Sequence, residues 1–262
     1  GVTHYMIDEW NPDEEFNVMI FQKRVKEIME DIYNRGKIPI LVGGTGFYIQ
    51  AVLNDIAFTK EKQGDEIRAD LQNRAKEKGA SYLHHELQKV DKESAGAIHP
   101  NNIKRVIRAL EYFQSTGQKF SDHNKEERQK GSPYNFLYLV LTMNRKVLYE
   151  RIDKRVDQMM EEGHVKEVKQ LLDAGYSRNL VSMQGLGYKE IASALFHECT
   201  MEEAVYRLKR DTRHFAKRQM TWFRRERDVT MIDKDNFLNN HEIVNYIMKL
   251  VAEKGICSCR EG

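Results

Sequence analysis

The sequence predicts an α/β protein whose parallel-sheet core is interrupted by a helical insertion. Apolar runs that do not alternate, as buried parallel strands require, occur at residues 38–43 and 135–143. Helical patterns separate the strand-like runs, which is the order of a parallel sheet with crossover helices. Residues 59–133 are charged, helical and poor in strand signals. We therefore expect a core domain of residues 1–58 and 134–262, with residues 59–133 as a helical insertion domain.

The core is expected to begin with a short strand at His4–Asp8. An amphipathic helix follows, since apolar side chains recur every three or four residues at Val18, Phe21, Val25, Ile28 and Ile32. Gly36 is expected to cap the end of that helix. Ile38–Gly43 then has the composition of a buried strand, and it leads into the glycine-rich turn Gly43–Gly46.

Within the insertion, Pro100 followed by two asparagines indicates a helix start, and Gly117 indicates its end. The polar stretch 117–132 is expected to be a loop. The core resumes with a buried strand in Asn135–Met143, followed by one long helix from Arg145 to about Ala174.

The last elements have equally local signals. Thr200 and Glu203 are spaced as a capping box at the start of another helix. Val229–Asp233 is expected to be the final strand, and a closing helix follows it.

Composition restricts the class of protein. The 262 residues are 40% hydrophobic and 31% charged, which suits one large or two small globular domains. No apolar run approaches the roughly 18–20 residues that span a bilayer, and no signal peptide is visible, so no membrane partner is expected. The three cysteines cannot form a disulfide framework, which favours the cytoplasm. Cys257 and Cys259 lack the partners of a zinc site. His84 and His85 are adjacent and would face different ways on a helix, so surface or capping roles are expected for them rather than metal binding.

The net charge of +2 does not by itself indicate a nucleic-acid partner, but its distribution does. Residues 206–227 hold nine Lys/Arg and two Asp/Glu. On a helix, Arg210, Arg213, Lys217 and Arg224 share one face without an interleaved acid. Such a face can simply be solvated, but mutual repulsion favours an anionic partner such as an RNA backbone or a pyrophosphate.

Two other clusters of cations are open to two interpretations. Arg151 and Arg155 lie one helical turn apart, where they could bind phosphate oxygens or pair with Asp153 or Glu150; the residues alone favour pairing. The cations of Ile103–Leu110 lie near a helix start, where an ordinary surface helix and an RNA contact are equally well supported.

A fourth candidate is the G-x-G spacing of Gly185 and Gly187 before a helix. Ordinary helix-entry loops also have this spacing, so the motif alone is weak. Gln184, Tyr188 and Lys189 add hydrogen-bonding and stacking groups that suit a nucleic-acid base.

Five motifs in their order along the chain resemble the tRNA dimethylallyltransferase (tRNA isopentenyltransferase) family of bacterial type. They are LVGGTGFY (Leu41–Tyr48), HPNNIKRVIRALEYFQSTGQKFS (His99–Ser121), LYERIDKRVDQMMEEG (Leu148–Gly163), QGLGYKE (Gln184–Glu190) and TRHFAKRQMTWFR (Thr212–Arg224). The resemblance implies a P-loop NTPase-like core with a helical insertion that binds tRNA.

The resemblance also implies an activity. Family members transfer a dimethylallyl group from dimethylallyl diphosphate, with Mg²⁺, to N6 of the adenosine 3′-adjacent to the anticodon. The target base is flipped into a channel. The family's P-loop and the aspartate proposed as its general base have no counterpart in this sequence, which begins at Gly1 rather than methionine. We expect an N-terminal segment that carries both to precede Gly1. We also expect a monomer, with no metal ligands in this chain.

The resemblance assigns roles to individual residues. Arg155 matches the family's catalytic arginine, which replaces the pairing interpretation given above, and the Gly43–Gly46 turn is expected to approach the flipped adenosine. The residues expected to bind tRNA are Thr45, Arg68, Lys104, Arg105, Val106, Ile107, Arg108, Gln184, Gly185, Leu186, Gly187, Tyr188 and Lys189. We further predict that Arg213, Lys217 and Arg218 support RNA or the diphosphate.

Three rival functions share some of these features. An adenylate isopentenyltransferase would prenylate a free nucleotide, but the basic residues Lys104, Arg105 and Arg108 of the insertion favour tRNA. A small-molecule P-loop kinase would share the core, and a non-enzymatic RNA-binding module would share the basic surfaces.

Overall fold

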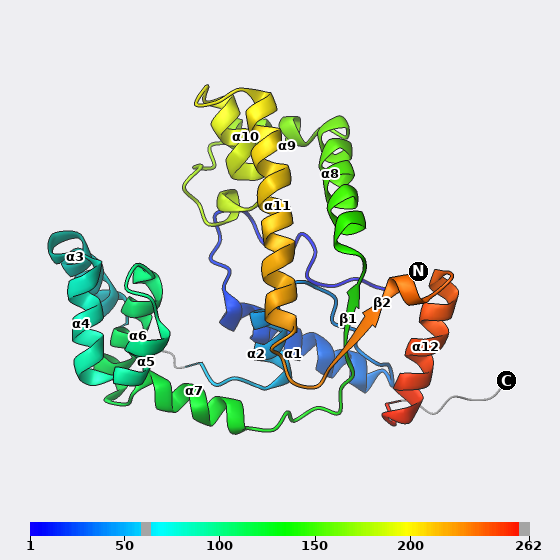
Figure 1. Ribbon diagram of the computed structural model, residues 1–262, viewed down its shortest axis with the longest axis horizontal. Helices are drawn as coiled ribbons and strands as arrows, with labels where there is room; N and C mark the ends of the chain where they lie inside the picture. Colours follow the sequence, from blue (N-terminus) through cyan, green and yellow to red (C-terminus); the bar gives the residue numbers. More distant parts are fainter. Residues whose placement is uncertain (59–63, 257–262) are drawn as a thin grey trace. The chain divides into compact units, whose positions relative to one another are not determined.

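The computed structural model describes residues 1–58 and 64–256, and the chain divides into two compact units. Unit 1 comprises Gly1–Val52 and Tyr134–Gly262, and unit 2 comprises Leu53–Pro133. Unit 2 is therefore inserted in the sequence of unit 1. Both units are mostly helical (Figure 1). Over the described ranges, every helix is too short or too polar to cross a lipid bilayer.

Two parallel strands in unit 1 confirm the predicted direction of the sheet. β1 (Tyr138–Thr142) pairs with β2 (Val229–Asp233), with Tyr138 opposite Val229. Both strands were predicted. Within each strand, one face is buried and the other is exposed. Val140 and Ile232 are buried, whereas the neighbouring Leu141 is 54% exposed.

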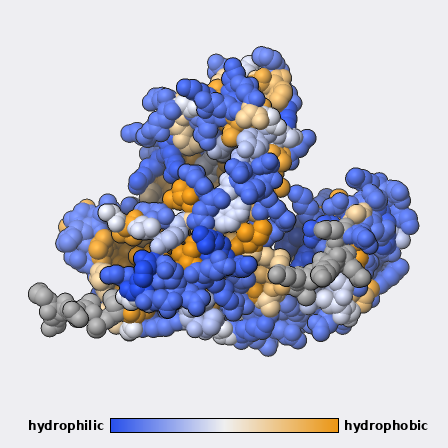
Figure 2. Space-filling view, turned by 180° about the vertical axis from the view of Figure 1, so that it is seen from behind, coloured by the Kyte–Doolittle hydropathy of each residue, from blue (hydrophilic) through white to orange (hydrophobic). Residues whose placement is uncertain are grey.

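Two other predicted strands are wrong. Residues 4–8 are irregular, and Met6 and Asp8 adopt positive φ angles of 65° and 53°. Residues 38–43 form no strand, and Ile40 and Val42 are 81% and 88% exposed. A strand needs a neighbour for its backbone N–H and C=O groups, and no other segment of the described chain hydrogen-bonds to residues 38–43. Figure 2 shows scattered hydrophobic areas on a mostly hydrophilic surface, and the side chains of Ile38, Leu41 and Val42 are among the exposed large apolar ones.

The helices α1 and α2 precede unit 2 in the chain. The α1 helix (Val18–Asn34) was predicted, and the side chain of Asn17 caps it by accepting hydrogen bonds from the backbone N–H groups of Met19 and Ile20. Its cap is Arg35, and the predicted cap residue Gly36 follows it with a φ of 65°. The α2 helix (Gly46–Leu53) begins inside the glycine-rich turn.

After β1, unit 1 continues as packed helices. The single helix expected from Arg145 is two helices, α8 (Arg145–Glu161) and α9 (His164–Asp173), because Gly163 between them has a φ of 102° that breaks the helical path. The next elements are η1 (Ser182–Gln184), α10 (Tyr188–Leu195) and α11 (Met201–Phe223).

The long helix α11 packs against both α8 and α10 (Figure 1). The predicted capping box at its start is confirmed, since the backbone N–H of Glu203 donates to Thr200 Oγ1 at 3.2 Å and Glu203 Oε2 accepts from Thr200 at 3.1 Å. Val168, Met183 and Ile191 form the centre of the core between these helices. After β2, η2 (Lys234–Asn236) and α12 (Asn240–Glu253) complete the described part of unit 1.

Unit 2 is built from five helices over its described residues: α3 (Gly64–Lys78), α4 (Ala80–Val90), α5 (Lys92–Ala97), α6 (Ile103–Thr116) and α7 (Phe120–Gln129). Its core centres on Leu71, Leu83, Leu87 and Val106, which are fully buried. Gly117 ends α6 in the left-handed conformation, as predicted.

The loop predicted at 117–132 is wrong, because most of it forms α7. Two contacts hold the start of this helix in place, one through a ring and one through a backbone hydrogen bond. The ring of Phe120 lies 5.7 Å from that of Tyr112, and the backbone N–H of Ser121 donates to Asp91 Oδ2 at 2.8 Å. The polar composition of the segment reflects the exposed side of a helix rather than a loop.

The buried carboxylate of Asp91 connects α5 to α7. Asp91 is 1% exposed, and it accepts hydrogen bonds from the backbone N–H of Ser94 at 2.9 Å, from Ser94 Oγ at 2.6 Å and from the backbone of Ser121. Burial by itself raises the pKa of this carboxyl, but the hydrogen bonds outweigh burial and lower the pKa below its usual value. Asp91 therefore caps α5 as an ionised group.

Replacing Asp91 with Ala should destabilise the protein by on the order of 3 kcal/mol, since buried donors lose their acceptor and α5 loses its cap. Glu93→Ala is the matched control. Glu93 also lies in the first turn of α5, but its ion pair with Lys125 is exposed, so its loss should cost less than about 0.5 kcal/mol. Urea unfolding measures both, and equal effects would contradict a special role for Asp91.

Candidate functional site

The glycine-rich turn Gly43–Gly46 lies directly against α11. The side-chain amide of Gln219 donates to the carbonyl oxygen of Gly44 at 2.9 Å. A Cβ atom added to Gly44 would lie 2.1 Å from that amide nitrogen, and one added to Gly46 would lie 2.2 Å from the ring of Trp222. Side chains of α11 thus approach both glycines closely, which the sequence did not reveal. The neighbour of Gly46 is an aromatic ring, which leaves no room for a side chain, whereas the neighbour of Gly44 is the flexible end of Gln219. Thr45, at the start of α2, is exposed.

Opposite charges on α8 and α11 pair across the two helices. Arg213 of α11 forms an ion pair with Asp153 of α8, and Lys209 binds Asp157 at 2.6 Å. Arg210 pairs with its own neighbour Asp211 at 2.8 Å. The prediction of a cationic face without acids is therefore wrong for Arg210 and Arg213, because the face meets α8 and includes Asp211.

Other cations on α11 stay unpaired. Lys217 and Arg218 are exposed and make no ion pair with any described residue. The guanidinium of Arg218 lies 5.7 Å from the ring centre of Phe215, a distance at which cation–π attraction orients it. Of the three cations predicted to support RNA or diphosphate, Arg213 is thus held by an acid, whereas Lys217 and Arg218 remain available to an anion.

Arg155 is exposed on α8 and forms no ion pair within the described residues. Its expected alternative partner, Asp153, binds Arg213 instead. The guanidinium of Arg151 lies 4.0 Å from the sulfur of Met143. The pairing of Arg151 and Arg155 with Asp153 or Glu150, which the residues alone favoured, is therefore wrong, and Arg155 keeps its full charge for another partner.

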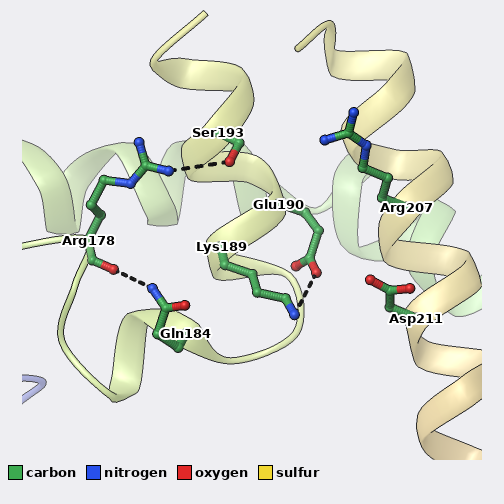
Figure 3. A pocket seen from close by; sticks show the side chains of 7 residues that line it. All are labelled: Arg178, Gln184, Lys189, Glu190, Ser193, Arg207 and Asp211. Carbon is green, nitrogen blue, oxygen red and sulfur yellow. Dashed lines mark hydrogen bonds and ion pairs between the residues drawn. The ribbon is translucent and has the colours of Figure 1, made fainter. Parts of the chain in front are cut away.

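A cavity of 290 Å³ lies where α10 and α11 meet the segment before α10 (Figure 3). Its lining residues are Arg178, Gln184, Lys189, Glu190, Ser193, Arg207 and Asp211. Gln184 donates to the carbonyl oxygen of Arg178 at 2.7 Å, and Lys189 pairs with Glu190 at 3.4 Å. The structure thus brings two predicted residues together with five that were not predicted. The five lie on three separate segments of the chain, and no spacing in the sequence connects them.

The guanidinium of Arg178 is fixed by a bidentate ion pair with Glu198, at 2.5 and 2.9 Å, and it also donates to Ser193 Oγ at 3.4 Å. This ion pair lowers the pKa of Glu198 to about 2, so the carboxylate stays charged at neutral pH. The side chain of Arg178 is therefore held at the edge of the cavity by Glu198 and Ser193, and its charge is already paired.

Tyr188 and His164 lie next to the Gly185–Gly187 loop and hold it in place through a shared contact with Glu167. The hydroxyl of Tyr188 donates to Glu167 at 2.6 Å, and His164 Nδ1 lies 3.2 Å from the same carboxylate. Burial raises the pKa of Tyr188 to about 12, and its bond to Glu167 adds to the shift. The hydroxyl expected to serve a nucleic-acid base is thus committed to holding the loop. Leu186 is partly buried in this loop.

Two features at the end of that loop, the backbone conformation and the lack of space for a Cβ atom, restrict position 187 to glycine. Gly187 has a φ of 98°, and a Cβ atom there would lie 2.6 Å from Nε2 of the buried His164. Its backbone N–H donates to Glu190 Oε2 at 2.9 Å, which caps α10. Gly187 is therefore a structural requirement of the loop that leads into α10, the helix that carries Lys189.

In unit 2, one buried carboxylate collects two of the predicted arginines. Arg68 donates to both oxygens of Glu111 at 2.8 and 3.1 Å, and Arg108 pairs with it at 3.5 Å. Glu111 is 1% exposed, so a buried carboxylate holds both guanidinium groups in place. Sequence reasoning missed Glu111, because it lies in the apolar part of α6.

The other residues of the predicted segment Lys104–Arg108 differ in exposure: two lie on the surface and two are buried. Lys104 and Arg105 are exposed. Val106 and Ile107 are 0% and 6% exposed, and they belong to the core of unit 2. The prediction that these two residues bind tRNA is therefore wrong for their side chains, since a helix that packs on a core must bury one face.

Metal ligands do not gather in the described residues: no group of three His, Cys, Asp or Glu could hold an ion there. Nε2 of His84 donates toward the carbonyl oxygens of Ala95 and Ile98, each at 2.9 Å, which is a structural role near the end of α5 and not metal binding. Cys257 and Cys259 lie outside the described residues.

Comparison with known proteins decides the family. A family model described as IPP transferase matches residues 1–226, which is most of the chain. The chain belongs to the IPP transferase family. A tRNA dimethylallyltransferase of Lachnoclostridium phytofermentans is 55% identical over 256 residues, which cover 98% of this chain and 82% of the relative.

Solved structures agree with this membership and confirm the predicted fold class. The tRNA isopentenylpyrophosphate transferase of Bacillus halodurans matches this IPP transferase with a TM-score of 0.68 and 42% identity, covering 97% of this chain and 80% of the other. A eukaryotic dimethylallyltransferase described as acting on tRNA matches with a TM-score of 0.79 and 27% identity, covering 97% and 66%.

Gly187→Ala should destabilise this IPP transferase more than Gly163→Ala does. Both positions have a positive φ, 98° and 102°, so both variants lose on the order of 1–2 kcal/mol to backbone strain. Only Gly187 adds a clash, because no atom lies within 4 Å of a Cβ at Gly163. Thermal unfolding of the two variants measures the difference.

A second substitution separates the clash from the strain. His164→Ala removes the ring that a Cβ at position 187 would meet, so it should cost less in the Gly187→Ala background than in the wild type. Strictly additive effects of the two substitutions would contradict the clash.

Proposed function

We propose that this IPP transferase is a tRNA dimethylallyltransferase, which transfers a dimethylallyl group from dimethylallyl diphosphate to N6 of the adenosine 3′-adjacent to the anticodon. The observation that carries the proposal is the 55% identity, over 98% of the chain, to a protein of that name. The likeness to a eukaryotic enzyme described as acting on tRNA supports the same substrate class.

The reaction requires charge stabilisation at the leaving group. The N6 nitrogen forms a bond to C1 of the dimethylallyl group while the C1–O bond breaks, so negative charge grows on the departing diphosphate and N6 loses a proton. A cation fixed in place before this moment stabilises the transition state more than the ground state. We propose that Arg155 has this role, supported by its exposure on α8 and by the absence of any ion pair with the described residues.

The neighbouring helix supplies further cations for the same purpose. Lys217 and Arg218 are unpaired on α11, and Arg213 is held toward α8 by Asp153. We assign all three to phosphate groups of the RNA or of the diphosphate. Lys217 and Arg218 are exposed cations without acids, which lower the energy of a polyanion that reaches them, and the pair with Asp153 orients Arg213.

We propose two RNA-binding surfaces, one in each unit. In unit 1 the exposed Thr45 hydroxyl and the segment Gln184–Lys189 meet nucleotides near the reacting base. In unit 2, Lys104 and Arg105 are exposed, and Arg68 and Arg108 are oriented on Glu111. Phosphate contacts of this kind supply affinity, which offsets the few kcal/mol that flipping the target base costs.

Mg²⁺ is proposed to arrive with the diphosphate. The described residues contain no group of three acidic, His or Cys side chains that fits the ion, so we derive no step through it. Likewise, no described residue is assigned as the base that accepts the N6 proton. The monomeric state and the cytoplasmic location inferred from the sequence stay predictions.

Transfer of label tests the function directly. The full-length enzyme is incubated with labelled dimethylallyl diphosphate and either tRNA or AMP, and label should appear on tRNA alone. Label on AMP without label on tRNA would instead favour an adenylate isopentenyltransferase. The comparisons do not favour that alternative or a small-molecule kinase, because the matched relatives carry the tRNA-modifying name.

Arg155→Ala should lower kcat by about 10²- to 10³-fold, the usual loss when a group that stabilises transition-state charge is removed. The Kd for tRNA should change by no more than a few-fold. Single-turnover kinetics and RNA-binding titrations measure the two quantities. Lys154→Ala is the matched control, because Lys154 is the adjacent exposed cation of α8 and should leave kcat nearly unchanged. Equal losses of kcat and affinity in Arg155→Ala would count against its role.

A further inference from the structure

We propose that the cavity between α10 and α11 binds one nucleotide of the RNA substrate, other than the reacting adenosine, whose base carries an exocyclic amine. The inference rests on the proposed function, because it takes RNA as the substrate. Adenosine, cytidine and guanosine carry such an amine, and uridine does not.

The first argument is a buried acceptor without a donor. Glu190 is 6% exposed, and its Oε2 accepts the backbone N–H of Gly187 at 2.9 Å. Its Oε1 is also buried but has no hydrogen-bond donor, and Lys189 lies only within ion-pair range at 3.4 Å. Leaving a buried acceptor without a hydrogen bond destabilises the folded protein, and an N–H group of a bound ligand would supply the missing hydrogen bond.

A second carboxylate faces the first. Figure 3 shows Asp211 on α11 directed toward Glu190 across the cavity. The hydrogen bond from Arg210 lowers the pKa of Asp211, so this carboxyl is ionised at neutral pH. Lys189 and Arg210 partly neutralise the two carboxylates, but both carboxylates can still accept hydrogen bonds. An amine of a base, which donates two N–H groups, fits between them.

The third argument is an unpaired cation beside the carboxylates. Arg207 is exposed and lies one helical turn before Asp211, and no described residue pairs with it. Arg178, in contrast, is committed to Glu198. Arg207 can therefore reach a phosphate while Glu190 and Asp211 hold the base of the same nucleotide.

Simpler ligands match only part of this lining. Inorganic phosphate would pair with Arg207 but would be repelled by the two carboxylates. A cationic peptide would suit the carboxylates but would meet Arg178, Lys189 and Arg207. A nucleotide with an amine satisfies both sets, and the 290 Å³ of the cavity is close to the lower limit of about 300 Å³ for small-ligand pockets.

Binding of substituted stem-loop RNAs tests the inference. Each loop nucleotide of an anticodon stem-loop is replaced in turn by an abasic residue, and Kd is measured by fluorescence anisotropy for the wild type and for Asp211→Asn. At one position other than the target adenosine, the abasic change should weaken wild-type binding by about 10-fold, the usual effect of a charged hydrogen bond. Asp211→Asn should remove most of that penalty, and uridine at that position should act like the abasic residue.

Matched controls separate pocket binding from general charge effects. Arg207→Gln should weaken binding, and addition of inorganic phosphate should not reproduce this loss. Lys169→Gln and Asp173→Asn change the same charges on exposed positions of α9, and both should leave the position-specific penalty intact. No position that couples to Asp211→Asn, or equal coupling in Asp173→Asn, would overturn the inference. Its failure is distinct from that of the function, since label can still be transferred to tRNA.

Discussion

The contact between the Gly43–Gly46 turn and α11 fixes the arrangement of the candidate site in unit 1. Gln219 holds the turn through the carbonyl of Gly44, and the ring of Trp222 covers Gly46. Because α11 is a single helix of 23 residues, this contact sets the position of everything further along it. Lys209 and Arg213, which pair with α8, lie near the middle of α11, and Arg207 and Asp211 of the cavity lie in its first half.

Ion pairs with acidic side chains distinguish the cations that are already held in place from those that are free to bind a substrate. Asp153 holds Arg213 and Glu111 holds Arg68 and Arg108, so these guanidinium groups are oriented but partly neutralised. An oriented guanidinium loses less conformational entropy when it binds a phosphate. Arg155 has no such partner among the described residues, and it keeps the full charge that a leaving diphosphate requires. The two kinds of environment suit RNA binding and catalysis respectively.

Local signals in the sequence predicted much of the fold, because capping and helix ends depend on near neighbours. The Thr200–Glu203 capping box and the left-handed Gly117 are examples. The α7 helix was missed because its anchor, Asp91, lies 30 residues before Ser121. In the site, motif resemblance pointed to Arg155 and Lys189, but Arg207, Asp211 and Ser193 reach the cavity only through tertiary packing. Such long-range neighbours leave no spacing in a single sequence.

The two glycine turns show why composition alone cannot assign a role. Gly44 and Gly46 have no positive φ, and what restricts them is space: the ring of Trp222 occupies the place of a side chain at Gly46, and the amide of Gln219 lies against Gly44. Gly187 needs both the left-handed conformation and the space, since His164 lies behind it. Both turns therefore depend on the packing of a neighbouring helix or ring. If the turns lie near the RNA as proposed, a substitution at either turn changes the geometry of the site without removing a proposed RNA contact, and its effect on activity then measures positioning.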